Sequence, residues 1–343
     1  METPLTQHIS ASRPAFHLRD YEKAGGYQSV QRALKTMNPK EITQLVQDSG
    51  LKGRGGAGFN TGMKWSFVPM NDSKQTKYLI CNADEMEPGT FKDRLLLEGN
   101  PHQLIEGMIV SAFAIQASQS YVFLRWAYKK AERLIRQAID EAYAGGYLGE
   151  NILGSGFNLE MHLHTGVGRY MCGEETALLN ALEGKRATPR TKPPFPQVSG
   201  LFGKPTIVNN VETLCNIPHI INNGADWFKG LSVGADAGTK LYGISGRVNK
   251  PGIWELPIGT TMRELLEHHA GGMKAGYQFR GALPGGASTD FLVAEHLDVK
   301  MDYVSVAAAG SRLGTGTMII LDDQTCPVGF VHNLEHFFAQ ESC

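Results

Sequence analysis

Between residues 38 and 210, short apolar runs alternate with longer amphipathic segments. Compact runs of apolar and β-branched residues predict strands, whereas apolar residues spaced three or four apart predict helices. The pattern predicts four strands, at 77–82, 121–125, 159–164 and 206–208, and four helices, at 38–47, 104–117, 129–143 and 174–182. Strands that alternate with helices are typical of a parallel sheet with crossover helices. We therefore expect an α/β fold.

The pattern then changes. Residues 184–205 contain five prolines and five basic residues but no acidic residue, which predicts a stiff, electropositive loop. After residue 238, short strands and glycine turns surround one helix that begins near Thr261, as in a small α+β domain. An amphipathic stretch that begins at Pro327 predicts a further helix.

The composition is unusual in its glycine content, which is 40 of the 343 residues. That share exceeds the usual value of about 7%, and no collagen repeat explains it. The excess indicates tight turns and places where a ligand approaches the backbone closely. The 33 basic residues nearly balance the 34 acidic ones, so charge does not indicate a nucleic-acid partner.

Targeting and redox signals are weak. The N-terminal residues lack the apolar core of a signal peptide, and the longest apolar stretch, 104–115, is interrupted by Glu106 and too short to span a bilayer. We expect a soluble protein without direct membrane insertion. Five widely spaced cysteines indicate a reducing compartment. His162 and His164 share a strand face, but without a third ligand nearby a structural role is favoured over a metal site.

The segment 53–58 matches the glycine pattern G-x-G-x-x-G. In an ordinary Rossmann fold this pattern follows a strand and is followed about 20 residues later by an acidic residue. Here it follows a predicted helix, and the first acidic candidate, Asp84, lies 26 positions after Gly58, which excludes that interpretation. Two remain: a nest of backbone N–H groups that binds an anion, helped by Arg54 and Lys64, or a glycine-rich surface turn.

Carboxylates follow the first predicted strand directly, at Asp84, Glu85 and Glu87. Ligands of open α/β sheets bind at the carboxyl ends of strands, so these acids stand where chemistry is expected. A ligand or metal site and a solvated acidic turn both fit this segment.

Further polar residues stand at two later strand–helix junctions. Glu174 and Glu175 suit ribose hydroxyls or a carboxamide, or simply the positive end of a helix dipole. Asn209, Asn210 and Thr213 suit a phosphate or a ring edge, or a helix cap.

Taken together, the segments 50–65, 81–94, 168–196 and 203–214 resemble the NADH-binding flavoprotein subunits of bacterial respiratory complex I. The resemblance covers essentially the whole chain. It extends to the diaphorase subunits of soluble NAD-reducing hydrogenases and NAD-dependent formate dehydrogenases, which share this module.

The resemblance implies an FMN- and NADH-binding Rossmann-like parallel-sheet domain at 37–228, preceded by an N-terminal extension at 1–36. A small ubiquitin-like (SLBB-type) α+β domain is expected at 229–325, and the start of a C-terminal helical iron–sulfur domain at 326–343. It also implies ligands for both cofactors. FMN is expected to contact Gly53, Arg54, Gly55, Lys64, Asn82, Asp84, Gly173, Glu174, Val208, Asn209, Asn210 and Thr213, with Gly56, Gly58 and Glu85 completing the cofactor-binding set.

For NADH, the adenine is expected to stack among Phe59, Phe67 and Phe195, and the ribose hydroxyls to meet Lys192 and Glu175. Tyr170 is expected to line the flavin pocket. Glu87 and Glu174, the two residues expected at the catalytic centre, lie near the nicotinamide. They orient it rather than transfer protons, because hydride transfer from NADH to FMN needs no general base.

In the resembling family, the iron–sulfur ligands follow the pattern E-S-C-x-x-C-x-x-C, with a fourth cysteine about forty residues later. Here Cys343 supplies the first of them, and one thiolate cannot hold a [4Fe–4S] cluster. We expect the cluster only in a complete chain, of which this sequence is a fragment; the alternative is a natural version without the cluster.

The implied function is NADH oxidation, with single electrons passing to iron–sulfur clusters and quinone. The expected partners are a thioredoxin-like 2Fe–2S subunit and the large iron–sulfur subunit, in the cytoplasm and peripheral to the inner membrane. The nearest alternative is the diaphorase subunit of a hydrogenase or formate dehydrogenase, and a different one is a nucleotide binder without catalysis.

Overall fold

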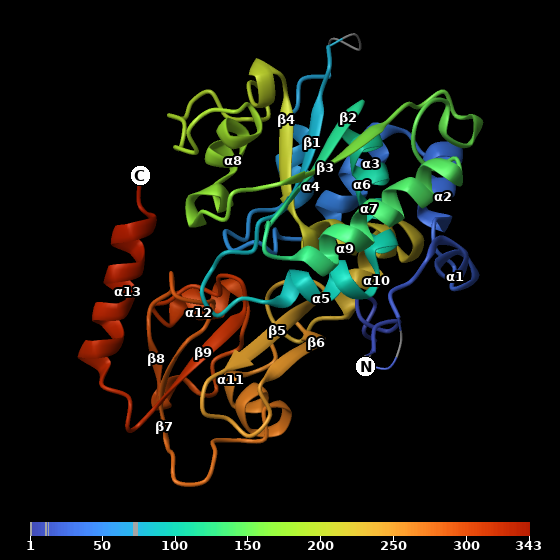
Figure 1. Ribbon diagram of the computed structural model, residues 1–343. Coiled ribbons are helices and arrows are strands. Elements are labelled where there is room, and N and C mark those ends of the chain that lie inside the picture. Colours follow the sequence, from blue (N-terminus) through green and yellow to red (C-terminus); the bar gives the residue numbers. More distant parts are fainter. Residues whose placement is uncertain (1, 11, 13, 71–74) are drawn as a thin grey trace.

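Two β-sheets organise the chain (Figure 1). The computed structural model describes residues 2–10, 12, 14–70 and 75–343. The first sheet has the strand order β3-β2-β1-β4 and the second the order β6-β5-β9-β7-β8.

All pairs in the first sheet are parallel, as expected. Its strands are β1 (Tyr78–Ala83), β2 (Gln119–Leu124), β3 (Glu160–Thr165) and β4 (Thr206–Asn210). Successive residues of β1 face opposite sides: Leu79 and Cys81 enter the large core, while Ile80 packs with Val208 on the other face. Because both faces are covered, the strands are apolar rather than alternating in polarity.

Helices cover both faces of this sheet. On the large-core side lie α6 (Pro101–Ile115), α7 (Lys129–Ala144) and α9 (Val211–Asn223). On the other side lie the 3₁₀ helices η2 (Tyr170–Gly173) and η3 (Leu201–Gly203), with α8 (Glu175–Leu182) between them. The helices expected at 104–117, 129–143 and 174–182 are confirmed, whereas α9, α5 (Lys92–Gly99) and the short η1 (Ile152–Gly154) were not foreseen.

The helices that precede the first strand in the sequence are α1 (Leu18–Lys23), α2 (Gln28–Thr36), α3 (Pro39–Asp48) and α4 (Thr61–Ser66). The expected start of α3 is confirmed, because Asn38 and Glu41 form a reciprocal capping box. Glu106, the acid that interrupts the apolar stretch, is buried on α6 and holds the N-terminal segment. Its carboxylate accepts hydrogen bonds from the Tyr21 hydroxyl at 2.5 Å and from the backbone N–H of Ser29 at 3.0 Å.

The second sheet is mixed, and its own core lies beneath it. The short α10 (Ala225–Gly230) leads into it. Its strands are β5 (Thr239–Ser245), β6 (Gly252–Pro257), β7 (Phe279–Leu283), β8 (Leu292–Val293) and β9 (Thr317–Asp322), and its helices are α11 (Met262–Glu264), the π-helical η4 (Leu265–His269), η5 (Ala294–His296) and α12 (Tyr303–Ala308). This is the expected small α+β unit, whereas the exact domain boundaries stay a prediction.

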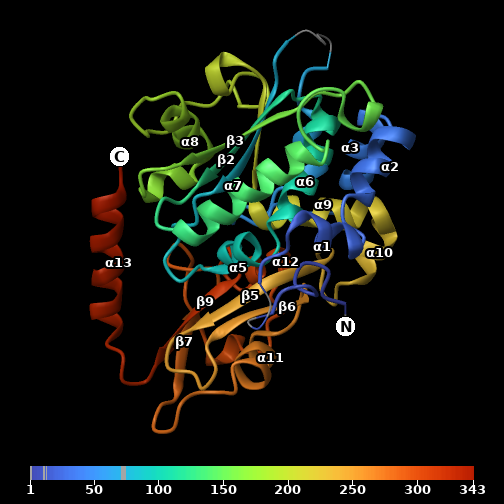
Figure 2. The same cartoon turned by 45° about the vertical axis from the view of Figure 1, so that its right-hand side comes forward.

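The expected helix at Pro327 is α13 (Pro327–Glu341). It starts beside the second sheet and runs along one edge of the molecule, so that its last turn lies near α8 (Figures 1 and 2). Among the residues that the structure describes, no helix is both long enough and apolar enough to cross a bilayer.

Candidate functional site

The order in which the chain adds strands to the first sheet reverses at β1. The chain places β2 and β3 on one side of β1 and then returns to place β4 on the other, with Asn82 opposite Asn210. The carboxyl ends of β1 and β4 therefore form a topological switch point, the place where open α/β sheets bind ligands. Most of the predicted site residues lie on segments that meet here.

The glycine loop 53–58 connects α3 to α4, which confirms that it follows a helix. The backbone N–H of Arg54 donates to the Thr213 hydroxyl at 2.8 Å, and Gly55 lies so close to Asn210 that a Cβ would sit 3.0 Å from its Cβ. Gly56, at φ +134°, faces open space, since no atom lies within 4 Å of where its Cβ would be. The loop is thus fixed on β4 and α9 while part of its backbone stays open to a ligand.

Two loop residues support the loop from inside. The Arg54 guanidinium is fully buried and donates to the carbonyls of Ala237 at 2.8 Å and Thr239 at 3.1 Å, so its charge lies beneath the loop instead of in the open nest that the sequence indicated. At Gly58 a Cβ would lie 2.6 Å from the Tyr303 ring. The conformation of this loop therefore depends on the second domain.

Asp84 is a buried carboxylate at the end of β1. Within the described residues, neither of its oxygens has a hydrogen-bond partner. Burial raises its pKa to about 7, and Arg125 opposes this only partly. Nearby, the Asn82 amide donates to the Gly173 carbonyl at 2.9 Å, and the side of Gly173 where a Cβ would stand is open. A buried acceptor without a donor is what an N–H group of a ligand would satisfy.

The end of β4 is tied to the scaffold. The Val208 carbonyl accepts a hydrogen bond from Lys64 Nζ at 2.9 Å. The Asn209 amide oxygen accepts one from Trp65 Nε1 at 2.9 Å, and the Asn210 amide donates to Asp93 at 2.7 Å. These two asparagines are therefore held rigidly at the switch point.

Glu174 and Glu175 open α8. Glu174 caps the helix, because Oε2 accepts the backbone N–H groups of Thr176 at 2.8 Å and Ala177 at 3.0 Å; its Oε1 faces Lys192 at 3.0 Å. Glu174 therefore has the capping role, and its second oxygen is paired with Lys192. Burial alone raises the pKa of Glu175, but Lys64 and Lys192 outweigh it and hold that pKa below its usual range.

Three phenylalanines of the predicted site stay half-exposed. The exposed fractions are 49% for Phe59, 54% for Phe67 and 54% for Phe195, and the first two rings lie 6.4 Å apart between centroids. Phe195 belongs to the proline-rich loop, which has almost no regular structure apart from η3, as expected.

Glu87 and Glu85 differ in what their carboxylates do. Glu87 accepts a hydrogen bond from the Tyr170 hydroxyl at 2.8 Å and one from the backbone N–H of Ser288 at 2.6 Å. Glu85 is buried and accepts the backbone N–H of Asp93 at 2.8 Å, so its carboxylate caps α5 instead of facing a ligand. The contribution of Ser288, from the second domain, was not foreseen.

Sequence reasoning also missed a buried charge cluster beneath the site. Lys92 Nζ lies 2.7 Å from both Asp93 Oδ1 and Glu212 Oε2, and Lys240 Nζ lies 3.4 Å from the same Glu212 oxygen. All four side chains are almost completely buried. Lys92, Glu212 and Lys240 are far apart in the sequence and give no local signal, so only the fold brings them together.

Metal-binding features are sparse in the part of the chain that the structure describes. No group of three or more His, Cys, Asp or Glu side chains is arranged to hold a metal ion there, and Cys343 is exposed. His162 packs against Tyr121 at 5.0 Å, and His164 stacks on Phe123 at 5.3 Å, in line with the favoured structural role.

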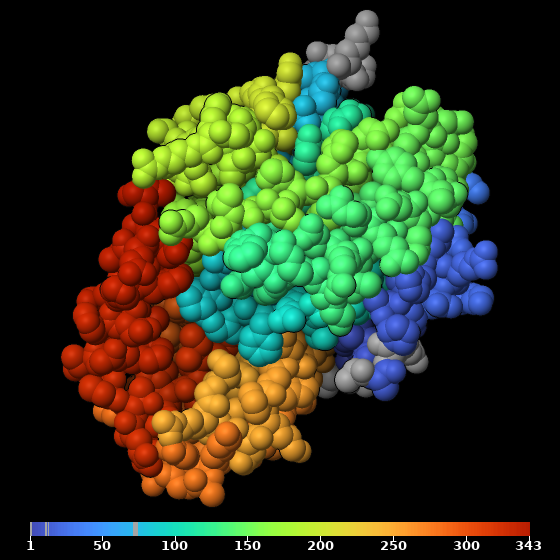
Figure 3. Space-filling model, in the orientation of Figure 1, coloured from blue at the N-terminus to red at the C-terminus, as the bar shows by residue number. Residues whose placement is uncertain are grey.

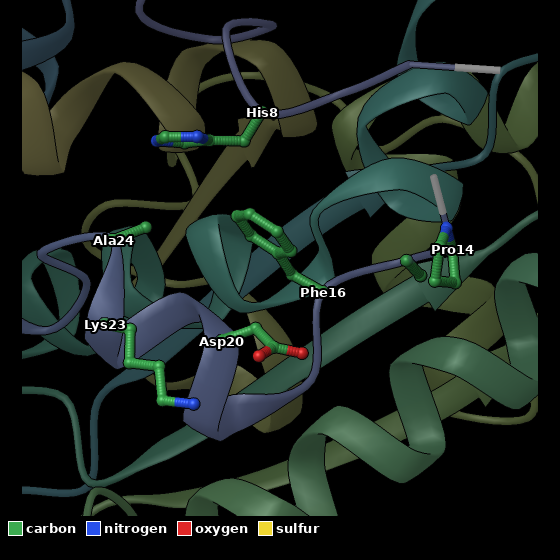
Figure 4. A pocket seen from close by; sticks show the side chains of 7 residues that line it. His8, Pro14, Phe16, Asp20, Lys23 and Ala24 are labelled. Atoms are coloured by element: carbon green, nitrogen blue, oxygen red, sulfur yellow. The ribbon is translucent and has the colours of Figure 1, made fainter. Parts of the chain in front are cut away.

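A hollow of about 470 Å³ lies elsewhere, on the N-terminal segment (Figure 4). The rings of His8 and Phe16 lie 5.3 Å apart there, with Asp20 and Lys23 of α1 beside them. Its lining includes no predicted site residue, so we place the functional site at the switch point.

Known protein families match two parts of the chain. A family described as "Nuo51 FMN-binding domain" matches residues 46–219, and an SLBB domain matches 241–292. The F subunit of the NADH-quinone oxidoreductase of Buchnera aphidicola (subsp. Schizaphis graminum) is 57% identical over 341 residues, which cover 99% of this chain and 76% of that one. The chain belongs to the family of NADH-quinone oxidoreductase F subunits.

Other members of this family are similarly close. The Escherichia coli K12 protein is 56% identical over 340 residues, covering 99% of this chain and 76% of its own length. Among solved structures, NAD⁺-reducing [NiFe]-hydrogenase in the H2-reduced state superposes with a TM-score of 0.82 at 34% identity. This chain matches 55% of that hydrogenase chain. The higher identity to the NADH-quinone oxidoreductase relatives favours complex I over the hydrogenase alternative.

Proposed function

We propose that this chain binds FMN and NADH at the β1–β4 switch point and oxidises NADH as the flavoprotein subunit of an NADH-quinone oxidoreductase. The observation that carries the proposal is Asp84. A buried carboxylate with both oxygens lacking a partner in the described structure, at the end of the strand where Asn82 holds the open-sided Gly173, fits a polar ring system that brings its own N–H donors. FMN has such a ring and one phosphate.

The residues present fit FMN in other respects. The glycine loop offers open backbone near Gly56, and Lys64 places a cation between α4, α8 and β4. Asn82, Asn209 and Asn210 are oriented by their own hydrogen bonds, so they need little reorganisation to receive a ligand. We assign the flavin to this set, together with Gly53, Arg54, Gly55, Asp84, Gly173, Glu174, Val208 and Thr213.

When bound, FMN accepts the hydride of NADH, and that chemistry belongs to the cofactor. The protein orients the nucleotide. Phe59, Phe67 and Phe195 offer half-exposed ring faces for the adenine. Glu87 and Glu174 would orient the nicotinamide end of the nucleotide.

The remaining assignments concern the assembly. The chain works in a multi-subunit complex, with the thioredoxin-like 2Fe–2S subunit and the large iron–sulfur subunit as partners, on the cytoplasmic side of the inner membrane. The Cys343 thiolate serves as one ligand of a [4Fe–4S] cluster when the other three cysteines of the family pattern are present. We keep the domain division at 1–36, 37–228, 229–325 and 326–343 as part of the proposal.

The test is to purify the chain with its flavin, identify the flavin against standards and assay NADH oxidation with ferricyanide as acceptor. We expect FMN, bound non-covalently, and NADH-dependent ferricyanide reduction. Asp84→Ala should lower FMN affinity by about tenfold or more, since a charge-assisted hydrogen bond contributes about 1.5–3 kcal/mol. FAD as the main flavin, or no flavin and no activity, would refute the proposal.

A further inference from the structure

The last turns of α13 contact both the backbone and the ring of Tyr170. The backbone N–H of Tyr170 donates to Glu341 Oε2 at 2.9 Å. The rings of Phe337 and Phe338 stand edge-on to the Tyr170 ring, with centroids 5.2 and 5.8 Å away. Figure 3 shows α13, in red, extending from the second domain to the segment that carries η2 and α8.

Tyr170 in turn holds Glu87. Its hydroxyl donates to Glu87 Oε2 at 2.8 Å. Burial and the neighbouring Glu87 raise the pKa of Tyr170 above its usual range, so the phenol stays protonated and remains a donor. The other oxygen of Glu87 accepts the backbone N–H of Ser288 at 2.6 Å. Glu87 is therefore fixed from two sides, and one of them depends on Tyr170.

The segment around Tyr170 has little internal support. It consists of a glycine turn, with Gly168 at φ +79°, and the four-residue η2. A short 3₁₀ helix makes few hydrogen bonds of its own. Glu341 takes up a backbone donor of this segment, and the two phenylalanines restrict the Tyr170 ring.

We propose that Phe337, Phe338 and Glu341 are positioning residues for the nucleotide site, acting through Tyr170 on Glu87. The inference rests on the proposed function. Without the contacts from α13, the Tyr170 ring can adopt more rotamers and Glu87 is no longer held in one position. The nucleotide must then order both side chains when it binds. The contacts described above for the residues assigned to FMN do not involve α13: Arg54 is held by Thr213, Ala237 and Thr239, and Gly173 is held by Asn82, so flavin binding should be spared.

The experiment compares Phe337→Ala/Phe338→Ala with Phe330→Ala in the FMN-loaded chain. Phe330 lies on the same helix and makes a similar ring contact, to Phe291 at 6.0 Å, but it does not contact Tyr170. For the double variant we expect the Kd for NAD⁺, measured by calorimetry, and the KM for NADH to rise about fivefold or more, with the Kd for FMN changed less than about twofold. Phe330→Ala should leave all three values within about twofold of the wild type.

A double-mutant cycle isolates the path through Tyr170. Tyr170→Phe keeps the ring and removes the donor to Glu87. If the helix acts through this hydroxyl, adding Phe337→Ala/Phe338→Ala to Tyr170→Phe should raise the Kd for NAD⁺ by less than about twofold. Fully additive effects in the cycle would overturn the inference.

Glu341 gives a second test if the double variant does not fold. Glu341→Ala removes the acceptor for the Tyr170 N–H and should weaken NAD⁺ binding, whereas Glu341→Gln keeps an acceptor and should restore it. Equal affinities for the two variants would contradict the proposal. A wild-type chain that binds no FMN refutes the proposed function; a wild-type chain that is active, with α13 variants that match Phe330→Ala, refutes only this inference.

Discussion

Lys64 Nζ lies 2.6 Å from one carboxylate oxygen of Glu175, and Lys192 Nζ lies 3.2 Å from the other. The two lysines come from α4 and from the proline-rich loop, so Glu175 joins three separate segments at the switch point. It therefore does more than stabilise the first turn of α8. Its negative charge also balances two cations at the place where we assign the ribose of NADH.

The first prediction concerns the choice between NADH and NADPH. Glu175→Gln keeps the shape but leaves Lys64 and Lys192 without their shared counter-charge, which favours an additional 2′-phosphate. We expect the ratio of kcat/KM for NADPH to that for NADH to rise by about ten- to hundredfold, corresponding to about 1–3 kcal/mol of charge interaction. Steady-state kinetics with both nucleotides measures this ratio.

Glu183→Gln provides the matched control. Glu183 follows the same helix at its other end, where it pairs with Lys185 and Arg190. This control should leave the ratio unchanged. An unchanged ratio in Glu175→Gln, with its FMN content intact, would remove Glu175 from the specificity site.

The second prediction is a pH dependence caused by Asp84. Its pKa is about 7 in the folded, flavin-free chain, above the ordinary value of about 3.9 for an unfolded aspartate. Between these two values the folded state holds a proton that the unfolded state has released, so stability falls as pH rises from about 4 to 7 and then levels off. Asp84→Asn should abolish this decline and be the more stable protein at pH 8, by on the order of 1–4 kcal/mol.

Urea unfolding of the flavin-free wild type and Asp84→Asn at several pH values tests this. The difference between the two curves matters, because it cancels other groups that titrate in the same range, such as Glu85 and Lys240. A difference that stays constant from pH 4 to 8 would show that Asp84 is not desolvated. FMN should diminish the difference, since a donor to the carboxylate favours its ionised form.

The third prediction concerns the buried charge cluster. Glu212 forms ion pairs with Lys92 and Lys240, and all three side chains are at most 1% exposed. Glu212→Gln removes the carboxylate that Lys240 pairs with and leaves Lys92 with Asp93 alone, and we expect the free energy of unfolding to fall by about 3–5 kcal/mol. Glu267→Gln, which breaks an exposed pair with Arg263, should cost less than about 1 kcal/mol. Similar losses in the two variants would contradict the role of the cluster.

Local patterns predicted the four strands of the first sheet and the helices α3, α6, α7 and α8, but not α1, α2, α4, α9 or α10. The apolar strands, the capping box at Asn38 and the helix starts at Glu174 and Pro327 depend on neighbours within a few residues, and the structure has them where they were expected. Helix α5 was missed because its start is capped by Glu85, from a segment that looks like an acidic turn.

The site was less predictable because its partners come from distant segments. Asn210 and its partner Asp93 are 117 positions apart, and Glu87 and Ser288 are 201 positions apart. The inward direction of the Arg54 guanidinium likewise depends on the carbonyls of Ala237 and Thr239, which lie 183 and 185 positions further along the chain. Motif resemblance identified candidate residues, but it could not indicate which side chains are already engaged with the scaffold.

The N-terminal segment has a consequence for synthesis on the ribosome. Glu255 on β6 accepts the backbone N–H groups of Leu5 and Thr6, which precede it by 250 and 249 positions. At about 5–20 residues per second, these donors leave the ribosome roughly 10–50 s before their acceptor is made. A nascent chain that has completed the first domain therefore still lacks Glu255, the acceptor for the backbone N–H groups of Leu5 and Thr6. In that interval Leu5, which is buried in the finished protein, is accessible to chaperones and proteases.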